Sequence, residues 1–330
     1  MFDEPLAKLT KDEIVQMCQR GFGREVKVGA IQEMGGGTFN ETYLVKLGGR
    51  NKAILRVAPQ PRPDLFWDDV VLMRREHAMF PYFASLSPLI PKILLTDFTH
   101  QLIDRDYMFQ SVLPGERWSE IEHELTPDEN LSLWRQCGEI VQRMHATSGE
   151  WFGYPFPGFH AQWSDVVLER FSRISQSMEA HELKLPTFDA IFKFIRNQSH
   201  IFDEIVRPSL LHGNLWTFNF LVERGEDGPT ITGVLDMERA WWGDPRADWI
   251  MFLLALRREN PQWEARIATF EAGYGDNEEI SPAPSHALLR RQIYKAMHIG
   301  LAAIWGFRHK REEEMEQATL QLDEIAESLP

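Results

Sequence analysis

Two polar segments in the second half of the chain carry side chains suited to binding a metal ion. Asn219 ends the loop segment LHGNLWTFN and comes directly before a strand pattern, and Asp236 follows the next strand pattern along the chain. Because a hairpin returns the chain to the edge where it began, we expect the Asn219 amide and the Asp236 carboxylate to lie together. Oxygen ligands of this kind suit Mg²⁺, which keeps water and phosphate oxygens as its other ligands. The spacing therefore predicts a magnesium site of the kind that phosphoryl transfer requires.

A glycine-rich turn near the N-terminus offers a second group of polar contacts. Gly36, Gly37, Thr38 and Asn40 lie between two strand patterns, where backbone N–H groups could cover phosphates. Most hairpin turns only join two strands, so this turn is weak evidence by itself.

The elements that must position these residues change in character along the chain. A capping box, Thr10 with Glu13, begins a short amphipathic helix. Strand-like and helical patterns then alternate over the first third of the chain: strands at 27–34, 42–47, 52–57, 92–97 and 107–112, and a helix at 66–84. Helical patterns follow at 127–146, 163–180, 187–206, 283–307 and 309–328, interrupted by a strand pair at 220–223 and 230–235. This order predicts an α+β fold with two domains, 1–113 and 114–330.

In order and spacing, these motifs resemble those of the aminoglycoside phosphotransferase-like family, which also contains fructosamine, choline and homoserine kinases. The family pattern is approximately HGDxxxxN, a short hairpin, an apolar residue with Asp, and GDPxxD. This chain has HGNLWTFN, VLD and GDPRAD in that order. The resemblance implies a two-lobed, protein kinase-like fold with a small β-rich N-lobe and a larger helical C-lobe. It also implies that Asn219 and Asp236 bind Mg²⁺ and that ATP, or alternatively GTP, donates the phosphate.

The same resemblance implies roles for residues of the N-lobe. Arg56 occupies the third-strand position where kinases have a lysine, and Glu76 on the next helix would orient it. The backbone of Gln110, Ser111 and Val112 would meet the adenine edge at the hinge after the fifth strand.

The catalytic loop departs from the family pattern at Asn214, which stands where the family has its catalytic aspartate. His212 is expected to orient the loop, and Asp244 and Asp248 to fix the loop and the following helix. An amide can hydrogen-bond an acceptor hydroxyl but cannot take its proton near neutral pH. Asn214 is then either an Asp→Asn substitution in an intact site or a native residue. If it is native, Glu238 or a water is the base, or the protein is a pseudokinase that binds ligand without turnover.

The acceptor is less clearly specified than the nucleotide. An aminoglycoside or amino-sugar-like compound is the first hypothesis, and a metabolic kinase of the fructosamine or choline type is the second, which Trp216 in HGNLW favours slightly. Aromatic residues beside carboxylates can bind cationic or polyhydroxylated molecules, although most tryptophans are core residues. Candidate lining residues are Trp151, Phe152, Trp163, Glu238, Trp241, Trp242, Glu271, Asp276 and Trp305.

The composition narrows the classes of partner. A formal net charge of -14 repels nucleic acid and anionic membranes and gives weak support for a cationic acceptor. Cys18 and Cys137 have no metal-binding or disulfide spacing, which fits a reducing cytoplasm. The first ten residues lack an apolar signal core, and no apolar run is long enough to span a membrane. We therefore expect a cytoplasmic monomer or homodimer.

Overall fold

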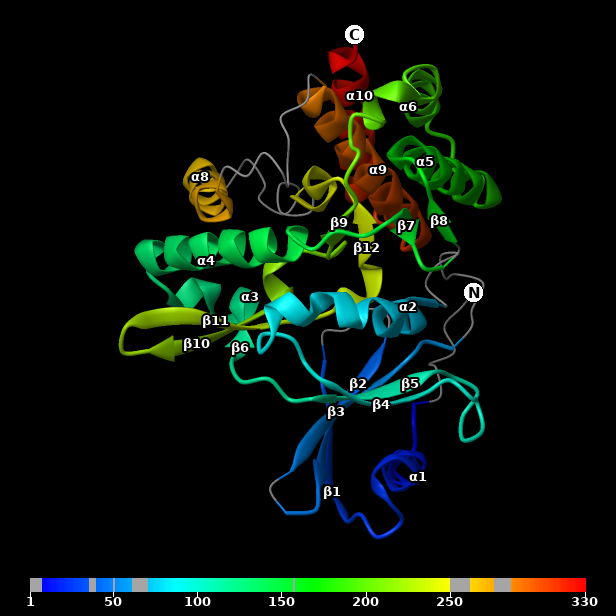
Figure 1. Cartoon of the computed structure of the whole chain (residues 1–330). Coiled ribbons are helices and arrows are strands. Elements are labelled where there is room, and N and C mark those ends of the chain that lie inside the picture. The colour runs from blue at the N-terminus through cyan, green and yellow to red at the C-terminus, as the bar shows by residue number, and fades with distance from the viewer. Residues whose placement is uncertain are drawn as a thin grey trace.

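The computed structural model describes residues 8–35, 40–49, 51–60, 71–156, 158–249, 262–275 and 286–330. These residues form an antiparallel sheet with one helix packed beside it, a helical region above it, and the short helix α2 between the sheet and the helical region (Figure 1). We use N-lobe for the sheet with α1, and C-lobe for the region that follows the sheet.

The N-lobe is built on a five-stranded antiparallel sheet with the order β1-β2-β3-β5-β4. Its strands are β1 (Val28–Glu33), β2 (Glu41–Leu47), β3 (Lys52–Val57), β4 (Ile93–Asp97) and β5 (Tyr107–Ser111). Helix α1 (Lys11–Phe22) begins with the predicted capping box, in which Thr10 and Glu13 bond reciprocally. Met17 and Cys18 of α1 pack with the apolar side chains of β2, β3 and β5. The five predicted strands are therefore confirmed.

Helix α2 (Leu72–Met79) joins the two lobes. It is shorter than the predicted helix at 66–84: residues 66–70 lie outside the described ranges, and a 3₁₀ helix, η2 (Phe80–Leu86), replaces the last turns. Pro81 lacks the N–H that would continue the α-helical pattern. Met79 and Phe83 belong to the same buried cluster as α4 of the C-lobe. Part of the sequence assigned to the first domain therefore packs in the second.

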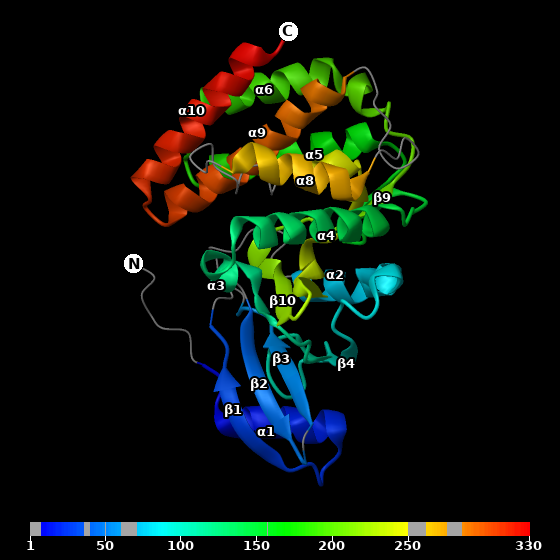
Figure 2. The same cartoon turned by 90° about the vertical axis from the view of Figure 1, so that its left-hand side faces the viewer.

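The C-lobe contains helices arranged around two small sheets (Figures 1 and 2). The described helices are α3 (Trp118–Ile121), α4 (Pro127–His145), α5 (Trp163–Ala180), α6 (Pro186–Asn197), α8 (Trp263–Tyr274), α9 (Ala287–Arg308) and α10 (Glu312–Ser328). One sheet has the order β11-β10-β6, with β6 (Glu116–Arg117), β10 (Phe220–Gly225) and β11 (Gly228–Val234). The other has the order β8-β7-β12-β9, with β7 (Phe152–Tyr154), β8 (Gly158–His160), β9 (Ser209–Leu211) and β12 (Trp241–Gly243). The predicted helix at 187–206 ends early, at Asn197, and is followed by the 3₁₀ helix η4 (Ser199–Phe202).

Helix α8 was not predicted from the sequence, and it crosses α4 at very short range (Figure 2). A Cβ atom at Gly138 of α4 would lie 2.2 Å from the carbonyl oxygen of Phe270. A Cβ atom at Gly273 of α8 would lie 2.1 Å from the carbonyl oxygen of Arg135. Neither distance is sterically possible, so the two glycines permit this crossing.

Among the described residues, no helix combines the length and the apolar character required to span a bilayer.

Candidate functional site

The loop after β9 is held in place through its backbone. Both oxygens of Asp248 accept backbone N–H groups, one from His212 and one from Gly213, each at 2.7 Å. Gly213 has φ +73°, and a Cβ there would lie 2.1 Å from the carbonyl oxygen of Arg239. The loop therefore requires glycine at this position. The predicted loop-fixing role of Asp248 is confirmed.

His212 ties this loop to the end of β11. Its side chain is fully buried, and Nε2 lies 3.0 Å from the carbonyl oxygen of Leu235. Burial lowers the pKa of His212, so the ring is neutral and donates its proton to this carbonyl. His212 thus orients backbone, which agrees with the expected role.

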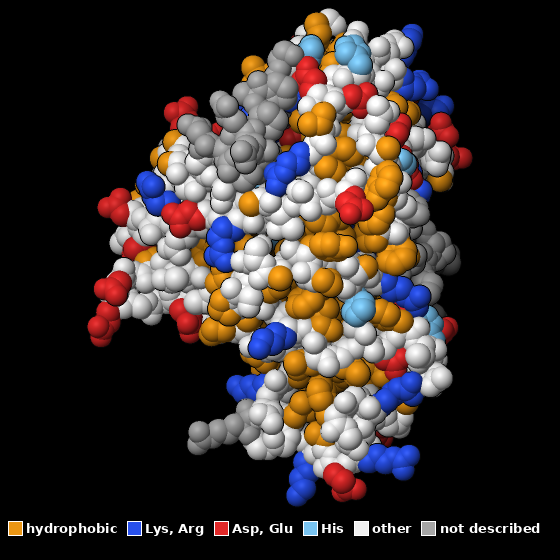
Figure 3. Space-filling view, viewed as in Figure 1, with side chains coloured by type: hydrophobic (Ala, Val, Ile, Leu, Met, Phe, Trp, Pro, Cys, Tyr) orange, Lys and Arg blue, Asp and Glu red, His pale blue; other side chains and the backbone are white. Residues whose placement is uncertain are grey.

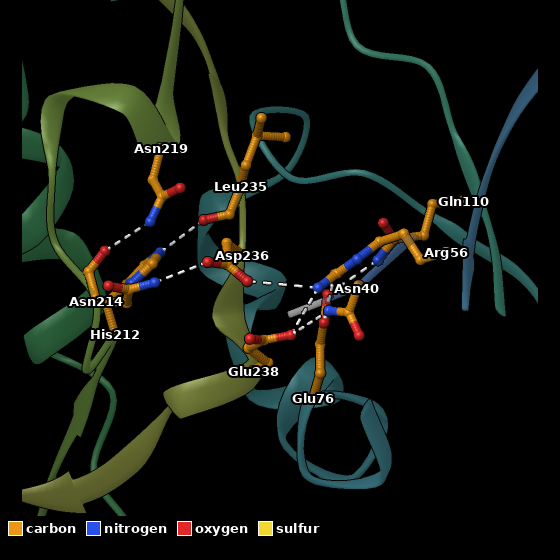
Figure 4. Close-up of polar contacts among 10 residues, drawn as sticks. All are labelled: Asn40, Arg56, Glu76, Gln110, His212, Asn214, Asn219, Leu235, Asp236 and Glu238. Atoms are coloured by element: carbon orange, nitrogen blue, oxygen red, sulfur yellow. Dashed lines mark hydrogen bonds and ion pairs between the residues drawn. The ribbon is translucent and has the colours of Figure 1, made fainter. Parts of the chain in front are cut away.

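Asp236, the second residue after β11, lies beside the two asparagines of the loop (Figure 4). Asp236 has left-handed dihedral angles, φ 66° and ψ 57°, which turn its carboxylate toward the loop. Asn214 Nδ2 donates to Asp236 Oδ2 at 2.7 Å. Asn219 Nδ2 donates to the carbonyl oxygen of Asn214 at 2.8 Å, so the Asn219 side-chain oxygen is not used in this bond. The structure therefore brings the predicted metal ligands and Asn214 to one place.

Arg56 of β3 is the centre of the charged contacts (Figure 4). Its guanidinium nitrogens lie 2.5 Å from Glu76 Oε2, 2.8 Å from Glu238 Oε2 and 3.4 Å from Asp236 Oδ1. Burial disfavours the charge on Arg56, but Glu76, Glu238 and Asp236 together raise its pKa. The predicted contact between Arg56 and Glu76 is confirmed.

Glu238 of the C-lobe contacts two residues of the N-lobe. Its Oε2 accepts from Arg56 and also from Asn40 Nδ2, at 2.6 Å, and the residue is 3% exposed. Burial, together with the neighbouring Asp236 carboxylate, raises the pKa of Glu238 to about 8. A buried carboxyl group that faces Arg56 and Asn40 is poorly placed to receive a proton beside Asn214. The contacts therefore favour a role in joining the lobes over the role of general base.

The hinge prediction needs a correction. The Ser111 N–H donates to the carbonyl oxygen of Lys92 at 2.9 Å, so it is not available to a nucleotide. Gln110 pairs with β3 and β4, and its side-chain amide donates to Glu76 at 2.9 Å. Both residues lie in the middle of the sheet, because β5 pairs with strands on each side. Val112 follows β5 and is 42% exposed, and its contact with the adenine edge stays a prediction.

The chemistry of this donor set fits a divalent cation. One guanidinium faces three carboxyl groups, so the cluster can accept further positive charge. An amide oxygen of Asn219 and the carboxylate of Asp236 are ligands that Mg²⁺ prefers. These two residues would hold the ion, and the ion would neutralise phosphate oxygens there.

Most of the aromatic residues considered for the acceptor belong to the core. Trp163, Phe152, Trp241 and Trp242 are between 0% and 4% exposed. Trp151 is 51% exposed on the surface. Acidic and basic side chains are interspersed on the face in Figure 3, so the net charge is not concentrated there. Gly36, Gly37, Thr38 and Asp276 lie outside the described residues.

The sequence analysis missed two buried residues that connect to the site. His145, at the end of α4, lies 3.1 Å from Asp248 Oδ2 through Nε2 and 3.0 Å from the Tyr274 hydroxyl through Nδ1. Arg75 is the neighbour of Glu76 on α2 and is 1% exposed. The available signal for Arg75 was its spacing from Leu72 and Met79, which places it on the buried face of the helix.

Comparisons with known proteins relate this arrangement to a family. Residues 30–288 match the model described as the phosphotransferase enzyme family (APH). "Probable ketoamine kinase YniA" of Escherichia coli (strain K12) is 28% identical over 187 residues, which cover 52% of this chain and 58% of that protein. "Probable ketoamine kinase in tonB 3'region" of Klebsiella pneumoniae is 33% identical over 104 residues, which cover 31% of this chain and 71% of that protein. The match thus spans less than two thirds of the length of the E. coli relative.

Solved structures share the whole fold. The crystal structure of aminoglycoside phosphotransferase APH(4)-Ia has a TM-score of 0.67 and 16% identity, and the match covers 97% of this chain and 100% of that one. The GDP complex of wild-type aminoglycoside 2'-phosphotransferase-IIIa has a TM-score of 0.62 and 14% identity, and the match covers 97% of this chain and 99% of that one. The predicted kinase-like α+β fold, with a β-rich N-lobe and a helical C-lobe, is therefore confirmed.

Proposed function

Because the chain belongs to the phosphotransferase enzyme family, we propose that it transfers the γ-phosphate of ATP, with Mg²⁺, to a hydroxyl group of a small molecule. The observation that carries this proposal is the convergence on Arg56. Glu76 from α2 and the carboxyl groups of Asp236 and Glu238 meet one guanidinium beside the loop that holds Asn214. Phosphoryl transfer depends mainly on positioning and charge neutralisation, which such a cluster can supply.

Each residue of the cluster has a distinct part in this proposal. Arg56 binds phosphate oxygens, and Glu76 orients it. Asn219 and Asp236 hold the metal ion, which neutralises charge on the phosphates when bound. Asn214 donates to Asp236 through Nδ2, so its Oδ1 is left to accept a hydrogen bond from the acceptor hydroxyl. Asn214 thus aligns this hydroxyl but does not take its proton.

We propose an acceptor related to ketoamines and amino sugars. The two relatives described above are named as probable ketoamine kinases, and a mutant of aminoglycoside phosphotransferase APH(4)-Ia, which shares this fold, was solved with AMP-PNP and hygromycin B. The words ketoamine and aminoglycoside in these names both point to acceptors that carry nitrogen as well as hydroxyl groups. Trp216, in the loop that holds Asn214, was the residue that favoured the fructosamine branch of the family.

Substitution of Asp236 tests the nucleotide half of the proposal. At a hundredfold excess over Kd, MgATP should stabilise the wild-type protein by about 2.7 kcal/mol, measured as a shift in Tm. Asp236→Ala should abolish the magnesium-dependent part of this shift. Asp227→Ala, on the exposed turn between β10 and β11, is the matched control and should keep it. An unchanged shift in Asp236→Ala would remove this carboxylate from the metal site.

A panel of acceptors tests the other half. ADP formation should increase with ketoamines or amino sugars but not with apolar alcohols. A second candidate function, nucleotide binding without turnover, is favoured by the amide at Asn214. MgATP binding with no acceptor-stimulated ADP release from any member of the panel would support this second candidate.

A further inference from the structure

Two neighbouring charged residues of α2 reach opposite parts of the molecule. Glu76 contacts the N-lobe, through Arg56 at 2.5 Å and Gln110 at 2.9 Å. Arg75 contacts the hairpin β7–β8 of the C-lobe, where its Nη2 donates to the carbonyl oxygen of Phe156 at 2.8 Å. Consecutive residues of a helix project about 100° apart, so one short helix can contact both sides.

The contacts of Arg75 lead back to the charged cluster through two aromatic rings. The Arg75 guanidinium carbon lies 4.2 Å from the centre of the Tyr154 ring. Tyr154 stacks on Trp241, with ring centres 5.0 Å apart and planes 14° apart. Trp241 begins β12, shortly after the 3₁₀ helix η6 (Met237–Arg239), and Glu238 of η6 contacts Arg56. Side-chain contacts and two short stretches of chain, 75–76 and 238–241, link these residues into a set that we call the cross-lobe circuit: Arg56, Glu76, Arg75, Tyr154, Trp241 and Glu238.

Helix α2 needs such anchors because it is short. It has eight residues, and Val71 at its N-cap makes no side-chain capping bond. Isolated helices shorter than about 12–15 residues are marginal in water, so tertiary contacts must hold α2 in place. A guanidinium that is 1% exposed needs a carbonyl oxygen and an aromatic face to offset its loss of water. Arg75 has both.

We propose that Arg75 is a positioning residue for nucleotide binding. It anchors α2 to the β7–β8 hairpin and so fixes the direction in which Glu76 holds Arg56. This inference rests on the proposed function, since it takes Arg56 to contact the phosphates. Its distinct content is that a C-lobe hairpin sets the geometry of an N-lobe arginine.

Affinity for MgATP, measured by calorimetry, tests the inference. Arg75→Gln and Tyr154→Leu should each weaken binding about tenfold, within the range of coupling between connected residues. Arg75→Lys keeps the charge without the planar stacking group and should recover only part of the loss. Arg74→Gln is the matched control: Arg74 lies on the same helix but pairs with Asp106 and lies over Phe98 in the N-lobe. It should change the affinity less than about twofold, as expected for a site outside the circuit.

Hydrogen exchange of the α2 amides without nucleotide separates this inference from the proposed function. Exchange at 72–79 should be faster in Arg75→Gln and Tyr154→Leu than in Arg74→Gln. If the wild-type protein does not bind MgATP, the proposed function fails and the inference fails with it. If the wild type binds but the two variants bind equally well and exchange at wild-type rates, only the inference is overturned. Tyr154→Leu keeps the Phe156 contact and so supplies the test where Arg75→Gln does not fold.

Discussion

The two sides of the loop that carries Asn214 differ in how their side chains are used. On the side that faces the N-lobe, Arg56 and Glu76 are buried and bonded to each other, and Arg56 also contacts the partly buried Asp236. On the C-lobe side, Trp163 and Trp241 are buried among apolar residues. Charged side chains must be held at fixed positions to bind phosphates, whereas the buried C-lobe tryptophans stabilise the fold by packing. The difference shows that a buried aromatic residue near a reactive loop is weak evidence for a binding pocket.

The largest expected effect in free energy is on this C-lobe side. Trp163 is fully buried, and its Nε1 donates to the Tyr294 hydroxyl at 2.7 Å. Trp163→Ala should destabilise the protein by about 3–5 kcal/mol, as large-to-small core substitutions do. The exposed Trp151, changed to alanine, should cost no more than about 0.5 kcal/mol. Chemical denaturation measures both, and equal effects would break the comparison between core and surface tryptophans.

The next largest effect concerns the loop itself. Asn214→Asp should raise the turnover number about 10²-fold or more by adding a general base, with little change in ATP affinity. The Asn214 amide donates to Asp236 at 2.7 Å, so a carboxylate there would face a like charge and lower Tm when no metal is present. Asn214→Ala removes the amide without adding a base and is the control. An Asp variant no faster than the wild type would show that Asn214 does not stand in for a base.

A smaller effect measures how strongly the N-lobe contacts act together. Arg56→Ala should weaken nucleotide affinity, and Glu76→Ala should reproduce part of the loss. Because the two side chains are 2.5 Å apart, their effects should be non-additive, with a coupling of about 0.5–3 kcal/mol. A double-mutant cycle of MgATP affinities gives this coupling. Strict additivity would argue against a shared role.

The smallest effect concerns the long-range charge. If the acceptor is cationic, the net charge of -14 should favour its binding, and its affinity should fall as salt is raised. Screening acts over about 8 Å at physiological ionic strength. Titration of the best acceptor of the panel at two salt concentrations measures the effect. Salt-independent binding of a neutral acceptor would contradict the predicted cationic class.

Local sequence patterns were sufficient for much of the fold. The strands of the N-lobe sheet and the hairpin β10–β11 were recognisable because alternation and glycine turns are local signals. Helix α8 was missed because its apolar and polar residues are not separated into two faces. The predicted helix at 66–84 was too long because the pattern continues past Pro81 although the backbone changes to 3₁₀ geometry.

The candidate site was predictable to a similar degree. Arg56 and Glu76 could be paired because the family resemblance assigned roles to the third strand and to the helix that follows it. The sequence does not show that β5 lies between two other strands, so it could not predict that the Ser111 N–H donates to the carbonyl oxygen of Lys92. Arg75 and His145 were missed because their partners lie far along the chain and only the tertiary structure brings them together.

The glycine pair between α4 and α8 has a consequence for mutational screens of this protein. Gly138 and Gly273 contact no ligand in the proposal, yet any side chain at either position would force the helices apart. A library selected for loss of activity should therefore recover changes at both positions as often as changes at Asp236. Protein abundance would separate the two groups, because the glycine variants should be depleted in cells while Asp236 variants accumulate normally.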